Sequence, residues 1–176
     1  MLKRITKLKE REELALLLFP LVFFLIAPLI HEYSHILFLE ALGCEHIVKL
    51  SVFSGGGMIK PLCEMTTNQA LFFLSVGLGM TFVFAFLFFI FARLKKENVS
   101  LSLALNSVGL GFFISGCTSL WEPKNDITTI LQVLRIEITE ITILSIQATA
   151  VILIILGIFY FWEEIELEER LFNREE

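Results

Sequence analysis

Long apolar runs alternate with short charged blocks along this chain. The charged residues gather in the first 13 residues, in Arg93–Glu97 and after Trp162. Four apolar segments lie between these blocks, at about 14–42, 70–92, 101–121 and 141–162. Each is long enough to cross a hydrocarbon core, which takes about 20 helical residues. The pattern predicts an all-α polytopic membrane protein, a single domain over residues 1–176 with four transmembrane helices.

The segment between the first two spans has a strand-like pattern. Ile47–Phe53 alternates in part between apolar and polar residues, Ser54–Gly57 is a strong turn signal, and Met58–Lys60 resumes an extended pattern. Unpaired backbone groups cost several kcal/mol each in hydrocarbon, so this segment must pair with itself or cover a cavity. We predict a short β-hairpin or re-entrant loop here.

The distribution of basic residues predicts the orientation. If the N-terminus is inside, the cytoplasmic segments hold ten Lys and Arg, and the outer loops hold only Lys49, Lys60, Lys124 and Arg135. This excess favours a multi-pass protein of the cell membrane, embedded in the lipid bilayer, with both termini in the cytoplasm. No small-residue cleavage site follows the first span, so we expect that span to be retained.

Composition adds little about partners. The hydrophobic content of 56% agrees with the spans, and the net charge of −5 arises largely in the tail, 163–176, where we expect a solvated helix. No basic patch interleaved with aromatic residues is present, which argues against a nucleic-acid partner. We expect Cys44, Cys63 and Cys117 to be buried free thiols. The alternative is a disulfide between Cys44 and Cys63, which flank one loop, if that loop faces an oxidising compartment.

A five-residue motif at the end of the first apolar run carries the chemistry. His31-Glu32-Tyr33-Ser34-His35 matches H-E-x-x-H. Residues four apart share one face of a helix, so both imidazoles can reach one metal ion, while Glu32 lies beside the first ligand as a candidate base for a metal-bound water. Ionisable groups inside a span are costly and usually functional. The alternative is a polar cluster that hydrogen-bonds between helices.

A catalytic zinc usually has three protein ligands, and Asp126 is the candidate for the third. The first and third spans run in the same direction, so the end of the third span and Asp126 lie on the same side as the histidines. The alternative role for Asp126 is to cap a helix at Ile127–Ile136, which Asn125 would also be able to do.

Other ligand candidates rank lower. Glu122 is the runner-up, and Glu40 or Glu45 would serve if the first helix continues past the motif. We expect His46, in the loop, to be an exposed or interfacial residue.

These features resemble the site-2 protease family of intramembrane zinc metalloproteases. The resemblance rests on the motif followed by Leu42-Gly43, on a glycine-bearing loop followed by Gly77-Leu78-Gly79, and on an acidic residue after a later span, in Asn125-Asp126-Ile127. It implies Zn²⁺ bound by His31, His35 and Asp126, with Glu32 activating the water that hydrolyses a peptide bond in or near the membrane. This chain differs from the family in having Ser34 where Gly is common and Ile127 in place of the Gly of an Asp-Gly pair, and the Asn-Pro motif often found upstream is absent.

The expected function is therefore a zinc metalloendopeptidase acting on a membrane-anchored protein or peptide, with Gly55–Met58 holding an extended substrate by strand addition. A zinc protease for lipid-modified peptides near the membrane is a variant of this hypothesis. The alternative from another class is a non-catalytic metal-binding membrane protein: a transporter, a sensor or an inactive scaffold. The second and fourth spans have almost no ionisable residues, which argues against a transporter.

Overall fold

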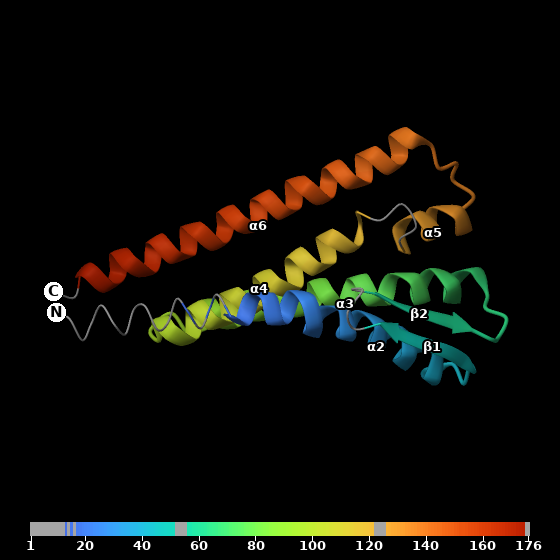
Figure 1. Ribbon diagram of the computed structural model, residues 1–176, viewed down its shortest axis with the longest axis horizontal. Helices are drawn as coiled ribbons and strands as arrows, with labels where there is room; N and C mark the ends of the chain where they lie inside the picture. The colour runs from blue at the N-terminus through green and yellow to red at the C-terminus, as the bar shows by residue number, and fades with distance from the viewer. Residues whose placement is uncertain (1–12, 14, 16, 52–55, 122–125, 175–176) are drawn as a thin grey trace.

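The computed structural model describes the chain except for residues 1–12, 14, 16, 52–55, 122–125 and 175–176 (Figure 1). The described part is mostly helical, with one small sheet, as the sequence predicts. In chain order its elements are η1 (Val22–Ile26), α2 (Ala27–Ala41), β1 (His46–Ser51), β2 (Gly56–Pro61), α3 (Thr67–Leu94), α4 (Val99–Ser119), α5 (Asp126–Val133) and α6 (Glu140–Arg174).

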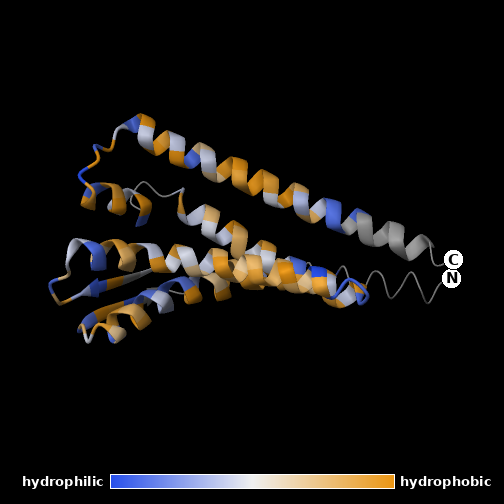
Figure 2. Cartoon of the chain, turned by 180° about the vertical axis from the view of Figure 1, so that it is seen from behind, coloured by the Kyte–Doolittle hydropathy of each residue, from blue (hydrophilic) through white to orange (hydrophobic). Residues whose placement is uncertain are grey.

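Among the described residues, four stretches of helix are long and apolar enough to cross a membrane, which confirms the expected number. They are Leu17–Ala41, Thr67–Leu94, Val99–Ser119 and Glu140–Glu164, each within a few residues of the sequence-based bounds. Figure 2 shows apolar residues along the middle of the long helices and polar residues toward their ends. Helix α6 continues to Arg174, so the acidic tail is helical over most of its length.

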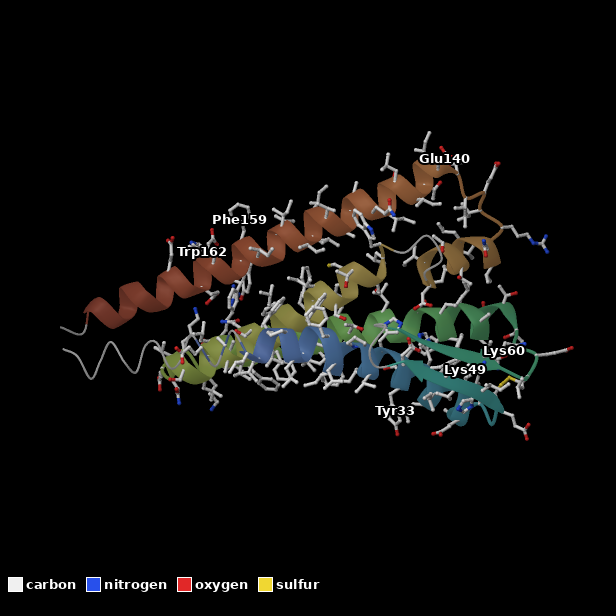
Figure 3. The ribbon with its side chains drawn as sticks, viewed as in Figure 1. Tyr33, Lys49, Lys60, Glu140, Phe159 and Trp162 are labelled. Carbon is white, nitrogen blue, oxygen red and sulfur yellow. A yellow bond between two sulfur atoms is a disulfide. The ribbon has the colours of Figure 1, made fainter. Side chains whose placement is uncertain are left out.

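The two ends of the molecule differ in the elements they hold. Lys49 and Lys60 of the hairpin and Glu140 of α6 lie at one end, and Trp162 lies toward the other (Figure 3). We refer to the first as the hairpin end. Trp162 lies near the end of its span, a position that suits tryptophan at a membrane–water interface.

The hairpin is confirmed as two antiparallel strands. His46 pairs with Pro61 and Ser51 with Gly56, and Leu62 N–H donates to the Glu45 carbonyl just beyond the strands. Strand β2 packs against α2, so the hairpin covers the helix that carries the motif. The backbone groups of β1 and β2 that face each other are thus paired within the hairpin.

The expectation of free thiols is wrong for two of the three cysteines. Cys44 and Cys63 form a disulfide, with their Cα atoms 5.5 Å apart. The strand register continues past His46 and Pro61 to bring these two residues opposite each other, which is why they pair. Cys117 is free and buried in α4, as expected.

Local signals define the helix ends that flank the hairpin. Helix α2 ends at Ala41, two residues before Gly43, whose φ of +66° favours glycine, and Cys44 N–H donates back to the Leu39 carbonyl. Helix α3 begins with a capping box in which Thr66 and Gln69 exchange hydrogen bonds. Both helices therefore begin or end close to the disulfide.

Helices α2, α3 and α4 form the central bundle, and α6 packs mainly against α4 (Figure 1). One buried cluster joins Val22, Ala27, Ala85 and Phe112 from the first three spans. Gly157 lets α6 approach α4, since a Cβ there would lie 2.8 Å from the Phe113 ring. Toward the hairpin end α6 diverges from the bundle, and α5 lies beside α3.

Candidate metal centre

Helix α2 presents its two motif histidines as a pair. His31 and His35 lie one turn apart, and their Nε2 atoms are 3.3 Å from each other. Both residues are largely shielded, His35 almost completely. Since Ala41 ends the helix, His31 lies about 15 Å of helix away from that end, at about 1.5 Å per residue. The pair is therefore set well inside the span rather than at its edge.

Asp126 reaches the histidines because the third span is short. Helix α4 ends at Ser119, and α5 begins with Asp126 and packs against α3. Asp126 Oδ2 lies 3.1 Å from His31 Nε2 and 3.6 Å from His35 Nε2. The predicted convergence of the three residues is confirmed in the structure.

The chain between α4 and α5 finds polar partners at this depth. Thr118 and Ser119 donate their hydroxyls to carbonyls of the preceding turn of α4. Gln147, on α6, donates to the Trp121 carbonyl at 2.8 Å. The Cys117 and Thr118 carbonyls at the end of α4 accept from the Leu120 and Trp121 N–H groups, so both backbone and side-chain donors satisfy this end of the helix.

The spacing of the three atoms fits a single metal ion. Ligand atoms about 2.0–2.1 Å from one tetrahedral ion lie about 3.3–3.5 Å from one another. The observed separations of 3.1, 3.3 and 3.6 Å scatter around this value. Two imidazole nitrogens and one carboxylate oxygen also form the donor set of many catalytic zinc sites, which leave the fourth position open. His31, His35 and Asp126 can therefore hold a metal ion.

The charge of Asp126 suits this role. Burial raises the pKa of its carboxyl group, but hydrogen bonds and electrostatic attraction from the His31 and His35 rings outweigh that effect. The resulting pKa is about 2, so the carboxylate is ionised at neutral pH. An ionised carboxylate is the form that binds a cation.

Glu32 lies under the hairpin. The Gly57 N–H of β2 donates to Glu32 Oε1 at 3.0 Å. A Cβ at position 57 would lie only 2.9 Å from Glu32 Cδ, so the strand backbone approaches this carboxylate as closely as a glycine allows. The sequence identified the glycine-bearing loop as a part of the site, but not this hydrogen bond.

The ring of His35 is held by packing. It lies 4.7 Å from the Phe73 ring of α3, beside a buried cluster of Leu39, Cys44 and Phe73. Among the described residues, His35 Nδ1 has no hydrogen-bond partner. Within the described chain, packing against Phe73 therefore fixes the orientation of this ring, with no hydrogen bond to its Nδ1.

The lower-ranked ligand candidates do not join the centre. Glu40 and Glu45 are exposed, and His46 Nδ1 lies 3.1 Å from the Cys44 carbonyl oxygen instead. Glu122 and the alternative cap Asn125 lie outside the described residues. Within the part of the chain that the structure describes, His31, His35 and Asp126 are the one group of this kind.

Asp126 is also the first residue of α5, which runs to Val133 and so ends before the expected Ile136. A carboxylate in the first turn of a helix is favourable, so Asp126 can stabilise α5 and still serve as a ligand, while the cap position before it lies outside the described residues.

Comparisons of the chain with protein families, with curated proteins and with solved structures found no match.

Proposed function

We propose that this chain is an intramembrane zinc metallopeptidase, similar in its site to the site-2 proteases. The observation that supports this most strongly is the group of His31, His35 and Asp126, whose mutual spacing suits a tetrahedral ion. Glu32 follows the first of these ligands on the same helix, as a general base requires. The proposed ligands lie among apolar helices. A metal bound there suits hydrolysis of a peptide bond within or near the membrane.

Zinc, when bound, would lower the pKa of a bound water toward about 7 and polarise a carbonyl. The chain's own residues would do the rest. Glu32 would take a proton from the water and return it to the leaving amine nitrogen. The Gly57 N–H holds one oxygen of this carboxylate, which restricts the side chain and leaves the other oxygen for proton transfer.

The proposed substrate is a membrane-anchored protein or peptide that is extended where it is cut. A helical substrate has all its backbone groups paired, so it must unwind before the scissile carbonyl is accessible. Strand β2, next to Glu32, offers backbone groups that an extended substrate segment would pair with by strand addition.

We further propose that the hairpin end faces the outside of the cell membrane and that both termini face the cytoplasm. Two independent features support this orientation. The Lys and Arg residues number ten against four in its favour. The Cys44–Cys63 disulfide also belongs at an oxidising face, since cytoplasmic thiols are kept reduced.

The test compares cells that express the wild-type chain with cells that express Glu32→Gln, by mapping new peptide N-termini among membrane proteins. The proposal predicts termini within or beside membrane spans that appear only with the wild type, while both purified proteins contain zinc. Identical termini in the two samples, with zinc retained in both, would contradict catalysis and leave a non-catalytic metal site.

A further inference from the structure

Helix α3 approaches the metal ligands with bare backbone at Gly77. This glycine is buried on the side of α3 that packs against α2. A Cβ built on it would lie 2.5 Å from His35 Nε2 and 2.7 Å from His31 Nε2. Both atoms are the proposed metal-binding nitrogens, so the missing side chain faces the point where the two rings converge.

We propose that Gly77 determines whether the site can hold an ion, because its lack of a side chain keeps the metal position open. The inference rests on the metal-binding part of the proposed function. An ion bound to both nitrogens lies about 2.0–2.1 Å from each. A methyl carbon 2.5 and 2.7 Å from the same nitrogens would occupy the space beside that ion and would displace at least one ring.

The surrounding contacts prevent the site from opening to accept a side chain. The His35 ring is buried against Phe73, so it has little room to turn away. On α3 itself, the buried Thr81 hydroxyl donates to the Gly77 carbonyl at 2.8 Å, one turn along the helix. Densely packed interiors shift only at a cost, so the added methyl group would act on the histidines.

Helix α3 offers a matched control two residues further on. A Cβ at Gly79 would meet nothing within 4 Å. Replacing either glycine with alanine raises helix propensity by a similar amount. The two variants therefore differ in what the new methyl group touches, and hardly in their effect on the helix.

The experiment measures zinc affinity of the full-length chain in detergent micelles, by competition with a chromophoric chelator. Losing a residue that hydrogen-bonds to a metal ligand weakens metal binding by roughly 10–100-fold. We expect Gly77→Ala to weaken zinc binding by more than this. We expect Gly79→Ala to stay within about twofold of the wild type, since surface changes usually have small effects. Circular dichroism of the metal-free proteins reports whether each variant is folded.

The outcomes distinguish the inference about Gly77 from the peptidase proposal on which it rests. Wild-type zinc affinity in Gly77→Ala overturns the inference about Gly77 and leaves the peptidase proposal standing. A wild-type chain that binds no zinc overturns both. If Gly77→Ala does not fold, the double variant Gly77→Ala/His35→Ala decides, because removing the ring should restore folding if the methyl group clashes with it. A double variant that stays unfolded overturns the inference.

Discussion

Asp126 Oδ2 lies 3.1 Å from His31 Nε2, and this contact joins the first span to the short helix that follows the third. Neither residue is near the other in the sequence. They meet because α2 and α4 end on the same side and because α4 is short, so that α5 lies alongside α3 at the depth of the histidines. The candidate metal centre is thus a product of helix direction and helix length.

Replacing Asp126 with alanine removes one of the three proposed metal ligands. Mutating a residue that only hydrogen-bonds to a metal ligand typically weakens metal binding by roughly 10–100-fold. We expect a larger fall in zinc affinity here, because a proposed ligand itself is lost. Equilibrium dialysis against zinc of the purified chain measures this. Glu140→Ala is the matched control, since this exposed carboxylate lies at the same end of the molecule and should not alter the affinity.

Replacing Gly57 with alanine should separate catalysis from metal binding. The new methyl group would meet the end of the Glu32 side chain, which can move at little cost to folding. Because the carboxylate would leave its position, we expect cleavage to slow by roughly 10²–10⁴-fold, the usual contribution of a general base, with unchanged zinc content. Zinc analysis and cleavage of substrates identified in the Glu32→Gln comparison test this. Full activity in Gly57→Ala would show that the close approach of β2 does not fix the position of Glu32.

Removing the Cys44–Cys63 disulfide should destabilise the fold. The bond closes a loop over a sequence separation of 19, for which chain entropy predicts a contribution of about 3 kcal/mol. We expect Cys44→Ser/Cys63→Ser to lose about this much free energy of unfolding in mixed-micelle titrations. A reductant should lower the wild type to the same value and leave the variant unchanged. A peptide map of the unreduced protein with both thiols free would contradict the pairing.

The proposed orientation is testable by labelling intact cells with a membrane-impermeant maleimide. Lys60 is exposed at the hairpin end, and Lys95 is exposed just beyond α3, at the opposite end. We expect Lys60→Cys to be labelled and Lys95→Cys to be labelled only after lysis. The wild type serves as the blank, because its cysteines are either paired or buried. The reverse pattern would place the hairpin end in the cytoplasm.

The sequence predicts the spans well because apolar length is a local property. It also predicts two ligands, since the spacing of His31 and His35 on a helix determines their common direction. Predicting Asp126 as the third ligand required one further step, which was to recognise that the first and third spans run in the same direction. The sequence pattern was sufficient for all of these because each depends on helix geometry alone.

Features that depend on how two elements pack were not predictable in this way. The disulfide was missed because it follows from the hairpin register, in which Cys44 and Cys63 continue the pairing of His46 with Pro61. The closeness of Gly77 to both histidines requires the approach of α3 to α2, which no local pattern encodes.

X-ray absorption spectroscopy of the zinc-loaded, purified chain tests the metal centre most directly. We expect one zinc per chain, with two imidazole nitrogens and oxygen ligands at about 2.0–2.2 Å, and loss of the imidazole signal in His31→Ala/His35→Ala. Sulfur ligation, or zinc that is equally well bound in that double variant, would contradict this expectation.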